Sequence, residues 1–383
     1  MSAMNPSQPQ SVSWKGATMK PALLGVFALC FGLAQAALAA EQAATRVAAS
    51  DPRFLYEGRI DTRDPEGPVL IWQGSRAEID FDGRTLGLEF DHAKDQNFFD
   101  VHVDGQVWVA EVPAGGPSRV EYPLPLSPGR HHLSLNKRQE AAAGTVQFKG
   151  IDIAKDARAW RPAAPVYTMA MEFYGDSITA GACDEDGDTD QWESRRTHNA
   201  EKSYAVLTAQ AFGADCRNIS ISGIGVVTGW IDPVAGQTWN RLYPSPDSPV
   251  VDLTRWVPDV VLVDLGDNDA DYPKAHGKSF PEGFADRYCE LIGAIRKGYP
   301  KTQIVLMMGG MYSGSQSAPL NEAWRQAVER LEASDPRIHD FTFRHWTMNH
   351  PRVADHQALA AELIPWLRQQ EFMLQAGSTT ARP

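Results

Sequence analysis

The clearest chemical signal in the chain is a serine that follows a short apolar run, in the segment Met171–Gly181. The order Gly175-Asp176-Ser177 presents a hydroxyl where a strand gives way to a loop or helix, the position that an activated nucleophile needs. Glycine, aspartate and serine are also the usual residues of turns, so this segment alone is compatible with either interpretation. The residues that follow it favour the nucleophile.

Three later segments carry residues that complete such a site. Gly223 and Asn268 each follow a predicted strand, and His350 precedes a predicted helix. In an open α/β sheet, ligands bind outside the carboxyl ends of the strands. We therefore expect Ser177, Gly223, Asn268 and His350 to meet at one edge of a sheet.

The elements that would position these residues alternate between strand and helix beyond a Pro/Ala-rich linker at 158–165. Predicted strands span 168–174, 216–222, 260–265 and 303–308, and predicted helices span 203–212, 281–297, 320–333 and 355–370. This alternation predicts an α/β domain with a doubly wound parallel sheet over residues 159–375. Residues 376–383 are expected to be a disordered tail.

Residues 46–158 show a different pattern. Short alternating segments, such as Ala77–Phe81 and Phe98–Val103, are separated by turns such as Asp82-Gly83 and Asp104-Gly105. Many short strands with regular turns predict an antiparallel β-sandwich, of the jelly-roll type. Nothing in this region proposes chemistry by itself.

The order of the motifs resembles a known superfamily. Gly-Asp-Ser, a later lone glycine, Gly266-Asp267-Asn268-Asp269 and a late His350-Pro351 together resemble the SGNH, or GDSL-type, hydrolases over residues 168–370. Upstream, Asn136–Glu140 and Gly144–Gly150 are similar to the end of the sandwich domain of carbohydrate esterase family two. That family pairs a jelly roll with an SGNH domain, so the resemblance spans almost the whole chain after its N-terminal segment.

The resemblance implies a role for each matching residue. Ser177 would attack an ester carbonyl, and His350 would accept its proton and later protonate the leaving alcohol. The oxyanion would be bound by the backbone N–H groups of Ser177 and Gly223 and by the side-chain amide of Asn268. Losing one such donor typically costs about 3 kcal/mol of transition-state stabilisation.

The chain departs from the superfamily where an acid often precedes the histidine by two or three residues. Met348 and Thr347 occupy those positions. We therefore expect a Ser-His dyad whose histidine is oriented by a backbone carbonyl, with Asp355 as an alternative partner. Asp176 and Asp269 are expected to hold turns by accepting backbone N–H bonds.

Neither a metal nor another cofactor is expected. No spacing of cysteine and histidine indicates zinc. The run Asp184–Asp190 lacks the glycine and glutamate positions of an EF-hand, so it is expected to be a solvated acidic loop, with calcium binding as the minor alternative.

Four tryptophans fall in predicted loops around the proposed edge: Trp192, Trp230, Trp239 and Trp346. A loop tryptophan can stack on a sugar ring, although burial in the core is the commoner use. Trp346, which is close to His350, is the expected substrate-binding platform.

The N-terminus has the pattern of a secretory signal. Two lysines precede an apolar run at 21–33 and an Ala-x-Ala stretch, so residues 1–40 are predicted to be a signal peptide that is removed. The apolar run is too short to cross a bilayer comfortably, which makes a membrane anchor the weaker hypothesis. The mature protein is therefore expected to be secreted or periplasmic, with no membrane contact.

Export implies an oxidising compartment, where disulfides persist. Of the three cysteines outside the predicted signal, Cys183 and Cys216 flank the proposed active-site segment and are the expected disulfide pair. Cys289 is expected to be a buried free thiol.

Composition excludes one class of partner. The 383 residues carry a formal net charge of −12, whereas a nucleic-acid partner would favour a clustered basic surface. The resemblance to carbohydrate esterase family two implies an O-acetyl esterase that acts on polysaccharides or oligosaccharides, and we expect it to be exported and monomeric. The alternatives are an esterase for other small acyl esters or envelope glycans, a catalytically decayed carbohydrate-binding protein, and a structural envelope protein.

Overall fold

A computed structural model of the chain describes residues 44–376. The predicted signal peptide at 1–40 and all but one residue of the predicted tail at 376–383 lie outside this range. Within 44–376, none of the helices combines the length and the apolar character that a membrane-spanning segment requires.

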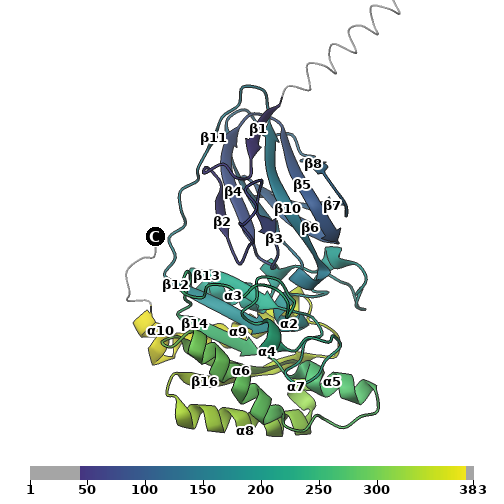
Figure 1. Cartoon of the computed structure of the whole chain (residues 1–383), viewed down its shortest axis with the longest axis vertical. Helices are drawn as coiled ribbons and strands as arrows, with labels where there is room; N and C mark the ends of the chain where they lie inside the picture. Colours follow the sequence, from purple (N-terminus) through teal and green to yellow (C-terminus); the bar gives the residue numbers. More distant parts are fainter. Residues whose placement is uncertain (1–43, 377–383) are drawn as a thin grey trace, which may run out of the picture. The chain divides into compact units, whose positions relative to one another are not determined.

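The first part of the described chain forms two antiparallel sheets (Figure 1). One has the order β1-β10-β5-β8, with β3 beside β10, and the other has the order β11-β4-β9-β6-β7, with β2 beside β4. The strands are β1 (Thr45–Ala48), β2 (Leu55–Glu57), β3 (Val69–Leu70), β4 (Arg76–Asp82), β5 (Leu86–Asp95), β6 (Asn97–Val103), β7 (Gln106–Val112), β8 (Ser118–Glu121), β9 (Arg130–Lys137), β10 (Gly144–Ile153) and β11 (Ala159–Trp160).

Alternation along these strands builds the core of the sandwich. In β4, Ala77, Ile79 and Phe81 are buried while the residues between them are partly exposed. The predicted antiparallel sandwich is confirmed. Its sheet continues two residues past the expected boundary at 158, because β11 pairs with β4.

The second part forms a five-stranded parallel sheet. Its order is β13-β12-β14-β15-β16, from strands β12 (Met169–Gly175), β13 (Ala214–Ser220), β14 (Val260–Asp264), β15 (Gln303–Met311) and β16 (Ile338–Thr347). Four of these strands match the predicted ones, and β16 was missed. It is an edge strand in which most residues are partly or fully exposed, so it lacks the continuous apolar run of a buried parallel strand.

Helices cover both faces of the parallel sheet, as the alternation predicts. Buried residues of α3 (Tyr204–Ala211) and α9 (Val353–Arg368) belong to one core, and those of α6 (Phe284–Gly298) and α8 (Ala318–Ser334) belong to another. The shorter helices are α2 (Ser177–Ala180), α4 (Ala235–Thr238), α5 (Asp267–Ala275), α7 (Tyr312–Gln316) and α10 (Glu371–Ala376), with 3-10 turns η1 (Ala141–Ala143), η2 (Arg195–Thr197) and η3 (Ala200–Lys202).

Buried polar contacts join the sandwich to the strands of the parallel sheet. Arg59 Nη2 lies 2.9 Å from Glu172 Oε1 on β12, and both side chains are almost fully buried. Gln73 Nε2 donates to the carbonyl oxygen of Ser220 at the end of β13, at 2.9 Å. The two strands that lead to Ser177 and Gly223 are therefore both bonded to the sandwich.

Candidate active site

The sheet order brings the ends of separate strands to one place. The chain passes from β12 to β13 on one side and then returns to β14 on the other, so the winding reverses between β12 and β14. A ligand site is expected at such a switch point. A cavity of about 490 Å³ lies there, and its lining includes a residue that follows each of the five strands: Ser177, Gly223, Asn268, Tyr312 and His350.

Ser177 is the first residue of α2, directly after the turn that ends β12. Asp176 caps this short helix, since its Oδ1 accepts the N–H of Ile178 at 3.0 Å. Ser177 is 7% exposed. Within residues 44–376, neither its hydroxyl nor its backbone N–H has a protein hydrogen-bond partner, so both are available to a ligand in the cavity.

Gly223 offers a second unpaired N–H in the described part of the chain. Its φ of +79° lies in the left-handed region that favours glycine. A Cβ at this position would also lie 3.1 Å from the Cβ of Trp230. The backbone therefore requires glycine here.

Asp269 holds the loop that follows Gly223. Its carboxylate accepts the backbone N–H groups of Val226, Val227 and Thr228 at 2.7–2.9 Å. The expected structural role of this aspartate is confirmed by these three bonds.

Asn268 reaches the cavity, but its amide is already engaged. Nδ2 donates to Asp176 Oδ2 and to the carbonyl oxygen of Ile224, both at 2.9 Å. An amide nitrogen has two hydrogens. Asn268 can therefore donate to an oxyanion only when one of these bonds is released.

His350 has a carboxylate partner that no local sequence pattern indicated. Its Nδ1 lies 2.7 Å from Asp190 Oδ2. An ionised carboxylate only accepts, so Nδ1 carries a proton. In the neutral ring Nε2 then has the free lone pair that a general base needs. The expectation that His350 lacks an acid is wrong, because the acid comes from a loop 160 residues earlier.

Asp190 is itself held as an anion. Arg352 Nη2 lies 2.8 Å from its Oδ1. Burial opposes the charge, but the hydrogen bond and charge of His350 and the bond from Arg352 bring the pKa of Asp190 well below its usual range. The lowered pKa keeps this carboxylate ionised at neutral pH.

The acidic run Asp184–Asp190 is used for internal contacts rather than solvation. Asp184 Oδ1 accepts the N–H of Asn199 at 2.9 Å, and Glu185 pairs with Arg138 and Lys202. The expectation of a solvated loop is therefore wrong for these acids.

Asp355, which was expected as an alternative partner of His350, bonds to other residues. Its Oδ1 is 2.8 Å from Nε2 of His345, and its Oδ2 accepts the N–H of Arg352 at the start of α9.

Two tryptophans line the cavity, and neither is the expected Trp346. The ring of Trp192 stacks on His350, with centroids 5.4 Å apart and planes 22° apart. Trp230 also lines the cavity and is 50% exposed. Trp346 does not line the cavity; its ring makes a T-shaped contact with Tyr312, which does, and Trp239 is buried in a core. The choice of Trp346 as the platform is not supported by this lining.

Buried carboxyl groups surround the nucleophile. Burial, and then the charge of Asp264, raises the pKa of Asp176 to about 7. Burial likewise raises the pKa of Asp264 to about 7 and that of Asp269 to about 6, and it raises the pKa of Asp267 well above its usual range. Raised pKa values favour the protonated forms of these groups, and protonation would lower the negative charge beside the position where an oxyanion would form.

The expected Cys183–Cys216 disulfide is absent from the described residues. Cys183, Cys216 and Cys289 are all free. Cys183 Sγ instead lies 3.4 Å from His198 Nε2 in a buried pair, and burial raises the pKa of this thiol far above its usual range. Cys289 is free as predicted but partly exposed.

Two groups of side chains within 44–376 have metal-ligand atoms close together. They are Cys183 with Asp190 and His350, and Asp100 with His102 and Glu201. In both groups the imidazole already bonds to a carboxylate of the group. In each group, therefore, one nitrogen of the imidazole ring already has a protein partner.

The chain is similar to known proteins over both of its domains. The family model "Carbohydrate esterase 2 N-terminal" matches residues 56–162, and the "GDSL-like Lipase/Acylhydrolase family" model matches residues 173–363. The cellulase/esterase CelE of Acetivibrio thermocellus is 30% identical over 339 residues, which are 84% of this chain but only 40% of that protein. An acetylxylan esterase/glucomannan deacetylase of Cellvibrio japonicus is 28% identical, over 83% of this chain and 90% of its own length.

A solved structure has the same two-domain fold. It is a family two carbohydrate esterase from Clostridium thermocellum in complex with cellohexaose. It is 30% identical to this chain, with a TM-score of 0.73, and the match covers 82% of this chain and 98% of that one.

Proposed function

Because the chain belongs to family two of the carbohydrate esterases, we propose that it hydrolyses O-acetyl esters on polysaccharides or oligosaccharides. The observation that carries this proposal is the cavity at the strand ends. It contains the unpaired hydroxyl of Ser177 together with His350, whose Nδ1 is fixed by Asp190.

The residues of the cavity would divide the reaction as follows. Nε2 of His350 takes the proton of Ser177 as Oγ attacks the acetyl carbonyl. The N–H groups of Ser177 and Gly223 bind the oxyanion, joined by Asn268 once its amide turns from Asp176 or Ile224. The tetrahedral adduct then expels the sugar hydroxyl with the proton from His350, and water releases acetate from the acyl-enzyme by the same route.

The substrate class is inferred from the relatives and the cavity wall. One relative is named for acetylated xylan and glucomannan, and another was solved with a glucose oligomer. Trp192 and Trp230 supply flat apolar faces on which a sugar ring can stack. We propose that they hold the glycan while its acetyl group enters the cavity.

We also propose that the enzyme acts outside the cytoplasm, as a secreted or periplasmic monomer. The support is the signal-like pattern of residues 1–40 and the polymeric nature of the proposed substrates.

The test is hydrolysis of 4-nitrophenyl acetate by the wild type and by Ser177→Ala, followed by acetate release from acetylated xylan, glucomannan and bacterial envelope glycans. We expect turnover that Ser177→Ala reduces to background, with release from the plant glycans. If both proteins are inactive while glycan binding persists, the chain is a carbohydrate-binding protein instead. Release from envelope glycans alone would change the substrate class.

A further inference from the structure

The segment Asn136–Glu140 at the end of β9 has no part in the proposed reaction, yet its five polar side chains are all buried. Burying so many polar and charged groups is costly unless each finds a partner. Their partners therefore indicate what the segment does. Several of these partners belong to the domain that carries the active site.

The carboxylate of Glu140 reaches the segment that contains Gly223. Its Oε2 accepts the backbone N–H of Ser222 at 2.5 Å, and its residue is 2% exposed. Ser222 directly precedes Gly223, whose N–H faces the cavity without a protein partner. A hydrogen bond to a buried anion is a strong one, so it fixes the peptide that comes before the proposed oxyanion donor.

The other oxygen of Glu140 faces the loop that carries Trp192. Oε1 lies 3.9 Å from Nη1 of Arg195. The guanidinium carbon of Arg195 is 4.0 Å from the centroid of the Trp192 ring, which stacks in turn on His350. An arginine stacked on an aromatic face is held by cation–π attraction as well as by its ion pair.

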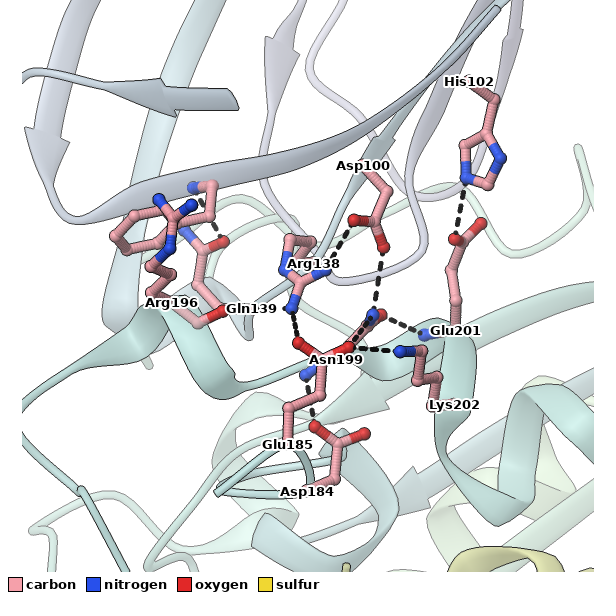
Figure 2. A network of polar contacts seen from close by, with 11 residues as sticks. Asp100, His102, Arg138, Gln139, Asp184, Glu185, Arg196, Asn199, Glu201 and Lys202 are labelled. Carbon is pink, nitrogen blue, oxygen red and sulfur yellow. Dashed lines mark hydrogen bonds and ion pairs between the residues drawn. The ribbon is translucent and has the colours of Figure 1, made fainter. Parts of the chain in front are cut away.

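A second residue of the segment supports the same loop. Figure 2 shows the guanidinium of Arg138 between Asp100 of β6 and Glu185. Arg138 also donates to the carbonyl oxygen of Arg196 at 3.0 Å. Glu185 and Arg196 lie on either side of Asp190 in the sequence, so the sandwich holds both ends of the loop that supplies the acid.

We propose that Glu140 is a positioning residue of the sandwich domain, which aligns the oxyanion segment at Gly223 with the loop that holds Trp192 against His350. The carboxylate of Glu140 bonds to Ser222, which precedes Gly223, and faces Arg195, which packs on Trp192. It touches neither the substrate nor the reacting atoms. The inference rests on the proposed function, in which Gly223 and His350 serve Ser177.

The experiment compares Glu140→Ala, Glu140→Gln and Arg195→Met with the wild type in the full protein. Glu140→Ala removes both contacts, whereas Glu140→Gln keeps an acceptor for Ser222 and removes the charge that faces Arg195. Tyr243→Phe is the control, because it deletes a 2.8 Å bond between the same two domains, to Asp61, away from the cavity. The readouts are kcat/KM for 4-nitrophenyl acetate, the melting temperature and the affinity for phenylboronic acid.

A boronic acid forms a tetrahedral adduct with a nucleophilic serine and so reports on the oxyanion donors. A variant that merely folds less well yields less active protein, but its folded fraction keeps the wild-type affinity for the boronic acid. Because small displacements of catalytic groups cost up to about 100-fold, we expect Glu140→Ala to lower kcat/KM and boronic acid affinity together by about 30-fold. In Glu140→Gln and in Arg195→Met, kcat/KM and boronic acid affinity should each fall about fivefold. In Tyr243→Phe both should fall by less than about twofold.

The proposal is overturned if Glu140→Ala folds and keeps both quantities within about twofold of the wild type. It is also overturned if the boronic acid affinity is unchanged while only the melting temperature falls. If Glu140→Ala does not fold, wild-type values for both Glu140→Gln and Arg195→Met overturn it. A wild type without Ser177-dependent turnover contradicts the proposed function itself, which is a separate result.

Discussion

His350 and Asp190 are bonded through Nδ1 and Oδ2 at 2.7 Å although 160 residues separate them in the sequence. Arg352, two residues after the histidine, pairs with the other oxygen of the same carboxylate at 2.8 Å. In the proposed reaction, Asp190 would be the third member of a Ser-His-Asp triad. The local sequence before the histidine offers no acid, because it has Thr347 and Met348. The acid thus belongs to a loop that precedes most of the α/β domain.

If Asp190 orients His350 as proposed, Asp190→Asn should strongly reduce the rate of ester hydrolysis. The amide cannot stabilise an imidazolium and can select the wrong tautomer, so we expect kcat for 4-nitrophenyl acetate to fall by roughly 10²–10⁴-fold. Asp188→Asn is the matched control, because Asp188 lies in the same loop and is exposed. Equal activity of the two variants would show that His350 acts as part of a dyad.

The cavity wall predicts that Trp192 matters and Trp346 does not. Trp192→Ala removes the ring that stacks on His350, and we expect about tenfold lower kcat/KM on both 4-nitrophenyl acetate and acetylated xylan. Trp346→Ala leaves the lining intact, so its values should stay within about twofold of the wild type. Steady-state kinetics of the two variants on the two substrates tests this prediction. A larger decrease in kcat/KM for Trp346→Ala than for Trp192→Ala would show that Trp346 is the substrate-binding platform.

Asp264 predicts a pH-dependent stability. Burial raises its pKa from an ordinary 3.8 to about 7, so between these values the folded state keeps a proton that the unfolded state has released. The free energy of unfolding therefore decreases as pH rises through this window and levels off above 7. Asp264→Asn removes the titration and keeps an oxygen for the hydroxyl of Tyr204, which donates to it at 2.9 Å.

The measurement is urea unfolding at pH 5, 6, 7 and 8. The free energy of unfolding of Asp264→Asn, minus that of the wild type, should rise by on the order of 2 kcal/mol between pH 5 and pH 8. The exposed Asp232→Asn is the control and should follow the wild-type curve. If the free energies of unfolding of the wild type and Asp264→Asn change with pH in parallel, the carboxyl group of Asp264 has the same pKa in the folded and unfolded states, which contradicts the prediction.

The free thiols of the described residues predict that no disulfide joins any two of Cys183, Cys216 and Cys289. Alkylation in denaturant without reductant should label Cys183, Cys216 and Cys289, and prior reduction should change neither the labelled mass nor the melting temperature. Peptide mass spectrometry identifies the labelled sites. A Cys183–Cys216 peptide that appears only without reductant would contradict this prediction.

Several features could be predicted from sequence because they depend on neighbouring residues. The apolar runs that end in Gly-Asp-Ser and Gly-Asp-Asn-Asp indicate buried parallel strands, and the structure brings Ser177 and Asn268 together at the ends of β12 and β14. Asp176 and Asp269 accept backbone N–H groups as turn residues do. The edge strand β16 was missed because its exposure hides the apolar pattern.

The sequence by itself determined the two-domain fold and the meeting of Ser177, Gly223, Asn268 and His350 at one edge of the sheet. The alternation of strands and helices and the residues that follow each strand are local features, and ligands bind at the carboxyl ends of the strands in such a sheet. Only the tertiary structure decided which acid faces His350, which tryptophans line the cavity and whether Cys183 meets Cys216. The positions of Asp190 and Trp192, for example, depend on the loop over 184–199, which ion pairs join to Arg138 of the sandwich and to Arg352 just before α9. Contacts between such distant segments leave no periodic signal in the chain, since they are set by the three-dimensional positions of the elements that they join.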